Sequence, residues 1–155
     1  MTWPTHIMAW LIIGQLTWDY TTAVACSFLI DTDHFLPIIK QWFFFKPRQM
    51  WKWLIEAEDT IITDQRNYFH SIFALILFSV IFLLINVHVW IVFAIAYGVH
   101  LLIDLFDASN FYPFYPIKSV NIKWYIRYCS KQELFFASWL FIIRLVLVFT
   151  HTRIN

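Results

Sequence analysis

The chain has 155 residues and a formal net charge of +1, and 61% of its residues are hydrophobic while only 14% are charged. Soluble domains are about half apolar and about a quarter charged, so this chain has more apolar side chains than a small soluble core can bury. Its mean hydropathy of +0.63 also favours a lipid environment. The composition therefore excludes an ordinary soluble domain, and the small net charge gives no reason to expect a nucleic-acid partner.

The first apolar stretch covers residues 6–30, and polar residues interrupt it near its middle. A carboxylate such as Asp19 is costly inside a bilayer and cheaper at the tip of a turn. We therefore expect a helical hairpin with its turn near residues 16–19. Each arm is shorter than the roughly 20 residues of a full span, so the hairpin is re-entrant or tilted. The alternative is a single tilted helix that crosses the membrane.

Two stretches mix basic with aromatic side chains, residues 34–64 and residues 107–132. Aromatic rings lie favourably at the depth of lipid headgroups, and basic side chains reach the lipid phosphates. We expect both stretches to lie along the membrane surface as interfacial loops, where they contact membrane lipid or a protein partner.

A second pair of apolar stretches, residues 69–85 and 89–106, is separated by the short break Asn86-Val87-His88. This pattern predicts a second helical hairpin, and residues 133–150 predict a last helix. The expected fold is an all-α integral membrane protein with two helical hairpins, a C-terminal helix and interfacial aromatic and basic loops. We expect one membrane-embedded domain over residues 1–155.

The basic residues are distributed unevenly between the two membrane faces. Both hairpins place their open ends on the same face, and nine of the eleven basic residues fall in loops there. The positive-inside rule makes this face cytoplasmic. The residues concerned are Lys40, Lys46, Arg48, Lys52, Arg66, Lys118, Lys123, Arg127 and Lys131.

Polar side chains with metal-binding groups gather at the open ends of both hairpins. In the second hairpin, His100 and Asp104 are four residues apart, which places them on one face of a helix. Antiparallel packing brings them to the depth of His70, which begins the other arm. In the first hairpin, His6 opens one arm and residues 31–34 close the other, so these residues also share one depth. The residues predicted to converge on the cytoplasmic face are His6, Asp31, Asp33, His34, His70, His100 and Asp104.

Such a convergence supplies what a divalent metal ion needs, several neutral imidazoles and carboxylates at fixed distances. Mixed nitrogen and oxygen donors suit zinc, manganese or iron(II) better than magnesium, and zinc is the metal we expect. Because a bound ion activates water and polarises carbonyl or phosphoryl oxygens, hydrolysis is the expected reaction. A lone interfacial histidine is usually only a surface polar residue, but the shared depth of several groups favours a metal site.

This hypothesis assigns a role to each candidate residue. Asp33 is expected to act as a general base or as a second ligand, and Arg66 to bind an anionic group or stabilise oxyanion charge. A substrate at this depth, next to basic and aromatic loops, is expected to be a lipid or a lipid-linked phosphoester. The expected metal ligands are His6, Asp31, His34, His70, His100 and Asp104.

The order of these motifs is similar to that of the YdjM-like family of inner-membrane-associated, metal-dependent hydrolases. That family has an early histidine, an Asp-x-Asp-His motif, a His-Arg-Gly-x-x-His-Ser segment, and a Gly-x-x-His-x-x-x-Asp helix followed by an aromatic, proline-containing stretch. The counterparts cover roughly the first three quarters of this chain: His6 and residues 31–34, 65–71, 98–104 and 111–116, of which residues 98–104 match the family spacing less tightly. The resemblance implies a hydrolase in the inner membrane.

The third motif departs from the family pattern, because Gln65 stands where the family has histidine and Asn67 where it has glycine. Gln65 is a poor metal ligand. Either Asp64 replaces it, or the site holds one ion fewer, or this chain is a degenerate member of the family.

Two other classes of function are weighed against the hydrolase. A non-catalytic membrane subunit would use the polar cluster as a hydrogen-bonded latch and its interfacial loops to bind a protein partner. A small transporter or channel would place polar residues along whole helices. The mid-helix positions here are almost entirely apolar, which counts against a transporter.

Overall fold

The computed structural model describes residues 3–33, 39, 42, 45–50, 68–127 and 130–151. Over these residues the protein is helical and has no β-strand, only isolated bridges. Most of the predicted interfacial stretch at residues 34–64 lies outside the described residues. The main helices are α1 (Trp3–Thr17), α2 (Tyr20–Ile30), α5 (Ile72–Ile85), α6 (Val87–Leu105) and α7 (Lys131–His151).

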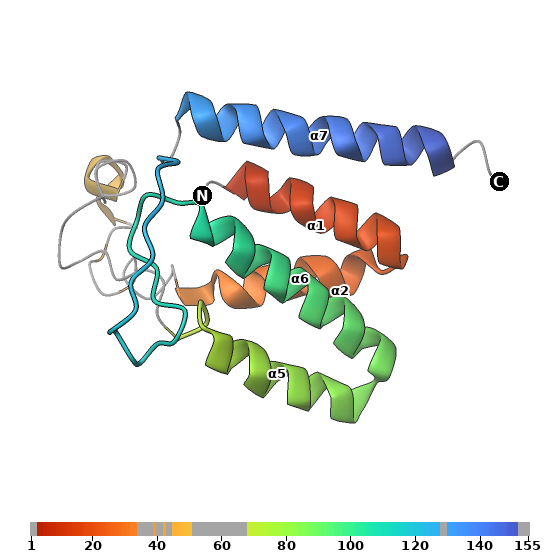
Figure 1. The fold of residues 1–155 in the computed structure, drawn as a ribbon, viewed down its shortest axis with the longest axis horizontal. Coiled ribbons are helices and arrows are strands. Elements are labelled where there is room, and N and C mark those ends of the chain that lie inside the picture. Colours follow the sequence, from red (N-terminus) through yellow and green to blue (C-terminus); the bar gives the residue numbers. More distant parts are fainter. Residues whose placement is uncertain are drawn as a thin grey trace.

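Helix α6 lies at the centre of the bundle and packs against α1, α2 and α5 (Figure 1). Helices α1 and α2 pack on each other, and α7 packs along α1 at the edge of the bundle. Figure 1 shows that α1 and α5 begin at one end of the molecule and that α2 and α6 finish at that same end. The polar residues at these four helix ends are therefore gathered in one region.

Short polar breaks separate α1 from α2 and α5 from α6. In each break a side-chain oxygen caps the N-terminus of the following helix. Asp19 Oδ1 accepts a hydrogen bond from the Thr22 N–H at 2.9 Å, and Asn86 Oδ1 accepts from the N–H groups of His88 at 2.8 Å and Val89 at 3.2 Å. Such caps satisfy N–H groups that have no partner inside the helix. Both breaks fall within the segments where the sequence predicts them.

Asn86→Ala is expected to lower the free energy of unfolding by about 1 kcal/mol, because the first turn of α6 loses its cap. Asn86→Asp keeps the accepting oxygen and should stay close to wild type. Unfolding of the protein in detergent micelles by increasing SDS, followed by far-ultraviolet circular dichroism, measures both. Equal stability of Asn86→Ala and wild type would show that the cap contributes nothing.

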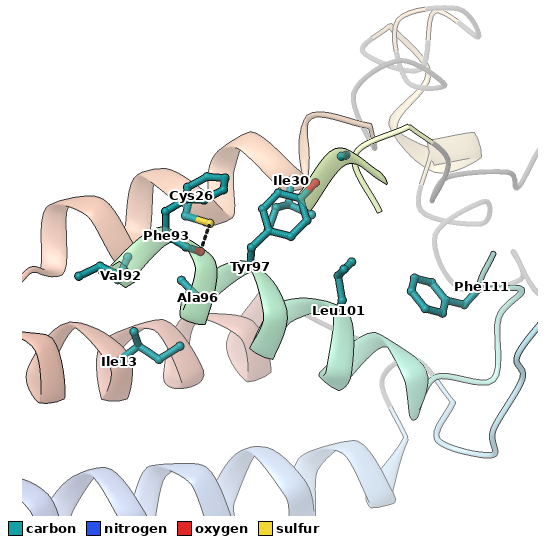
Figure 2. Packing of buried hydrophobic residues seen from close by; sticks show 11 residues of the cluster. Ile13, Cys26, Ile30, Val92, Phe93, Ala96, Tyr97, Leu101 and Phe111 are labelled. Carbon is teal, nitrogen blue, oxygen red and sulfur yellow. Dashed lines mark hydrogen bonds between the residues drawn. The ribbon is translucent and has the colours of Figure 1, made fainter. Parts of the chain in front are cut away.

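The main apolar core lies where α6 meets α1, α2 and α5. Phe93 and Tyr97 of α6 are fully buried in it, and the Cys26 thiol of α2 donates a hydrogen bond to the Phe93 carbonyl at 3.6 Å (Figure 2). Ala23 and Ala96 are also fully buried. Small side chains at such contacts allow helix backbones to approach closely, as in membrane proteins generally.

Helix α7, at the edge of the bundle, exposes a large apolar surface. Among the described residues, α6 and α7 are long and apolar enough to cross a membrane, and only 6% of the spanning window of α7 is buried. A contiguous exposed apolar face of this kind is unfavourable in water and favourable against lipid. The large apolar residues that α7 exposes are Leu134, Phe135, Trp139, Phe141, Ile142, Leu145, Val146, Val148 and Phe149.

Candidate metal centre

The candidate site lies at the end of the bundle where α1 and α5 begin (Figure 1). His6 comes from α1, Asp31 caps the C-terminus of α2, His70 precedes α5, and His100 and Asp104 lie in the last turns of α6. All five side chains, which we call the histidine–aspartate cluster, belong to residues that are at most 7% exposed. Residues from four segments of the chain are thus buried together.

His70 lies just outside a helix, although the apolar pattern predicts that it begins one. Helix α5 starts only at Ile72, because the Ser71 hydroxyl accepts a hydrogen bond from the Ala74 N–H at 3.2 Å and caps it there. On the other side of His70, the Tyr97 hydroxyl donates to the Phe69 carbonyl. These two contacts fix the backbone of His70 beside α6.

Four donor atoms of the cluster face one another. The Nε2 atoms of His70 and His100 are 3.3 Å apart. Asp104 Oδ2 lies 3.5 Å from the first and 3.4 Å from the second, and Asp31 Oδ1 lies 3.8 Å and 3.5 Å from them. Both carboxylates therefore approach the same pair of imidazole nitrogens.

These separations fit a tetrahedral metal ion. Zinc binds imidazole nitrogen and carboxylate oxygen at about 2.0–2.1 Å, and a tetrahedron with such bonds has edges of about 3.3–3.4 Å. The two imidazole nitrogens are 3.3 Å apart, and each of the two carboxylate oxygens lies 3.4–3.8 Å from both of them. The donor set also suits manganese or iron(II). The residues present thus match a divalent ion in both chemistry and spacing.

His6 approaches the same region from the other oxygen of Asp104. Its Nε2 lies 3.3 Å from Asp104 Oδ1. The His6 ring stacks on the His100 ring with centroids 4.2 Å apart, and the Trp10 ring lies nearly parallel to the His100 ring at 6.0 Å. His6, His100 and Asp104 therefore form a second group able to hold a metal ion, which shares His100 with the group of Asp31, His70 and His100.

Asp33 lies against the opposite nitrogen of His70. Its Oδ2 is 3.3 Å from His70 Nδ1 and accepts a hydrogen bond from the Phe69 N–H at 2.7 Å. Because the four facing donor atoms include His70 Nε2, the His70 ring separates this Asp33 oxygen from them. The spacing of Asp31 and Asp33 in the sequence does not reveal this difference.

Of the predicted site residues, His34 and Arg66 lie outside the described residues, and so do Gln65 and Asn67. Trp10 and Tyr97 are also neighbours of the site, and neither is among the residues predicted from the sequence. Trp10 is four residues after His6 and Tyr97 is three before His100, so helical spacing was the available signal. The predicted residues that the structure brings together are His6, Asp31, Asp33, His70, His100 and Asp104.

The fold and the site together define a helical membrane protein with a buried group of histidines and aspartates that could hold a metal ion. The chain belongs to the YdjM inner membrane protein family, whose family model matches residues 1–155. The family assignment from the motifs is thereby confirmed, and the likeness extends from the first three quarters to the whole chain. Neither the curated proteins nor the solved structures include a match to this chain.

Proposed function

We propose that this protein is a membrane-bound, metal-dependent hydrolase whose active site is the histidine–aspartate cluster. The observation that supports this proposal is the spacing of buried donor atoms: the Nε2 atoms of His70 and His100 are 3.3 Å apart, and one oxygen each of Asp31 and Asp104 lies 3.4–3.8 Å from both, close to the edge of a zinc tetrahedron. Zinc is the preferred ion, with manganese or iron(II) as alternatives of similar ligand preference.

Charge burial also supports a bound cation. Asp31 and Asp104 are buried at the end of an apolar bundle, where carboxylates need compensating charge and hydrogen bonds. A divalent ion compensates both carboxylates and leaves the histidines neutral. Protonated histidines would compensate them as well and would make the cluster a hydrogen-bonded latch in a non-catalytic subunit, so metal content decides between the two.

Each residue of the cluster has a defined part in the proposed site. A bound ion supplies Lewis acidity for hydrolysis by water. Asp104 turns one oxygen to His70 and His100 and the other to His6, so it would be available as a ligand on both sides. The stacked rings of His6 and Trp10 cover His100 and exclude water from that side.

We propose further that α1 with α2 and α5 with α6 enter the membrane as two hairpins whose open ends face the cytoplasm. The support is the predicted bias of basic residues toward loops at those ends. A site at the helix ends suits a substrate whose polar group lies at headgroup depth, a lipid or lipid-linked phosphoester. The loop that follows α6 at this end of the bundle also carries a cation: Lys118 Nζ lies 5.5 Å from the ring centroids of Tyr112 and Tyr115.

Metal content is the first test of this function. Protein purified in detergent, incubated with zinc and freed of excess metal should retain at least about one zinc per chain, and His100→Ala should retain less than about a tenth of that. His88→Ala is the matched control, because it removes a histidine whose side chain is 60% exposed and lies near Asp19, at the break between α1 and α2. Its zinc content should equal that of wild type.

Wild-type protein that retains no zinc, manganese or iron would contradict the proposed function and favour the latch. Equal zinc in His100→Ala and wild type would exclude His100 as a ligand.

The loaded protein is expected to release inorganic phosphate from vesicles that contain phosphatidic acid in phosphatidylcholine. If the His100→Ala variant released phosphate at the wild-type rate, the histidine–aspartate cluster would not be the site of that activity.

A further inference from the structure

We infer that Asp33 is a positioning residue that turns His70 toward the metal ion, and that it is neither a ligand nor the general base. This inference rests on the metal site proposed above. It concerns a carboxylate that is 3% exposed and comes from the end of α2, two residues after the proposed ligand Asp31.

The two nitrogens of His70 face different partners. Nε2 faces His100, Asp104 and Asp31 at 3.3–3.8 Å, while Nδ1 faces Asp33 Oδ2 at 3.3 Å. An ionised carboxylate only accepts hydrogen bonds, so it binds the imidazole form that carries its proton on Nδ1. That form leaves the lone pair of Nε2 directed at the ion. A carboxylate on the outer nitrogen is the usual means by which proteins orient a metal-binding histidine.

Asp33 also fixes the backbone next to His70. The same oxygen accepts the Phe69 N–H at 2.7 Å, and the Tyr97 hydroxyl donates to the Phe69 carbonyl. The peptide groups that precede His70 are thus held from α2 on one side and from α6 on the other. Because His70 lies outside α5, these bonds replace the positioning that a helix would give it.

His100 is oriented by different means. Within the described part of the chain, no hydrogen-bond partner lies at His100 Nδ1, and the ring is held by its stack with His6 at 4.2 Å. Loss of the Asp33 carboxylate should therefore disturb one of the two imidazoles and leave the other in place. The expected result is weakened metal binding with an unchanged set of ligands.

Zinc affinity, measured by competition with a chromogenic chelator, tests this role. Asp33→Ala is expected to weaken zinc binding about 10–100-fold, the range for residues that orient ligands. Asp33→Asn should recover most of that loss, because its amide oxygen can take the place of Oδ2 and accept both N–H groups. With saturating cobalt(II) in place of zinc, both variants should show the visible absorption spectrum of the wild type. Asp31→Asn is the matched control and should change that spectrum.

Each other outcome overturns the inference. Wild-type affinity in Asp33→Ala would show that the carboxylate does not orient His70. An Asp33→Asn variant as weak as Asp33→Ala, or with an altered cobalt spectrum, would identify Asp33 as a ligand. A wild-type protein that binds no metal would refute the proposed function itself, whereas the first two results leave that function intact.

Tyr97→Phe tests the inference where Asp33→Ala does not fold. It removes the hydroxyl that holds the Phe69 carbonyl and leaves every proposed ligand in place. Zinc binding should weaken by about tenfold, at the low end of the range for such residues. Wild-type affinity in this variant would contradict the view that the bonds around Phe69 position His70.

Discussion

Asp104→Asn is expected to weaken zinc binding more than about a hundredfold, beyond the range seen when an orienting residue is lost. Asp104 is the carboxylate that three histidines share: Oδ1 lies 3.3 Å from His6 Nε2, and Oδ2 lies 3.5 Å from His70 Nε2 and 3.4 Å from His100 Nε2. Asparagine keeps the shape of the side chain but removes its negative charge. The ion then loses a ligand and the anion that compensates its charge.

Asp107→Asn is the matched control for this substitution. Asp107 is a buried carboxylate three residues further along the chain, and its Oδ1 accepts the Ser109 N–H at 3.1 Å, a bond that an amide oxygen can keep. It belongs to neither group of potential metal ligands. Chelator competition should give it wild-type zinc affinity. Equal losses in both variants would instead point to general destabilisation of this end of the bundle.

The part of the site that depends on local geometry could be predicted from the sequence. His100 and Asp104 are four residues apart on one helix, and this spacing allows His100 Nε2 to lie 3.4 Å from Asp104 Oδ2. The approach of His70 to His100, 30 residues away in the chain, also followed from a sequence feature, the short polar break at residue 86 that lets α5 return as α6. The polar breaks between apolar stretches thus predicted where the helices end and the next ones begin.

The direction of each aspartate could not be predicted in the same way. Asp31 and Asp33 are two residues apart at the end of α2, where Asp31 is predicted as a ligand and Asp33 as a general base or second ligand. Which nitrogen of His70 each one faces depends on how the His70 ring is rotated. The contact of Asp33 with Nδ1 sets that rotation, and bonds to Phe69 hold the backbone beside it; these contacts arise only when the helices pack.

Gly14→Ala is expected to lower the free energy of unfolding by about 1–3 kcal/mol, as overpacking of a close contact does. A Cβ atom on Gly14 would lie 2.9 Å from the Cα atom of Tyr20 and 2.6 Å from its Cδ1 atom. Because one of these atoms belongs to the backbone, the clash cannot be relieved by rotating a side chain. Helices α1 and α2 must move apart, against the gain of about 1 kcal/mol that alanine brings to a helix.

Gly98→Ala is the matched control, because it makes the same change in α6 where nothing lies within 4 Å of the added Cβ atom. It should be as stable as wild type or slightly more so when unfolding is followed in detergent with increasing SDS. Since α1 carries His6 and α2 leads into Asp31, Gly14→Ala should also weaken zinc binding, while Gly98→Ala should not. A Gly14→Ala protein that unfolds like Gly98→Ala would show that α1 and α2 do not need this close contact. One that is less stable but keeps wild-type zinc affinity would show that the contact supports the fold without positioning the site.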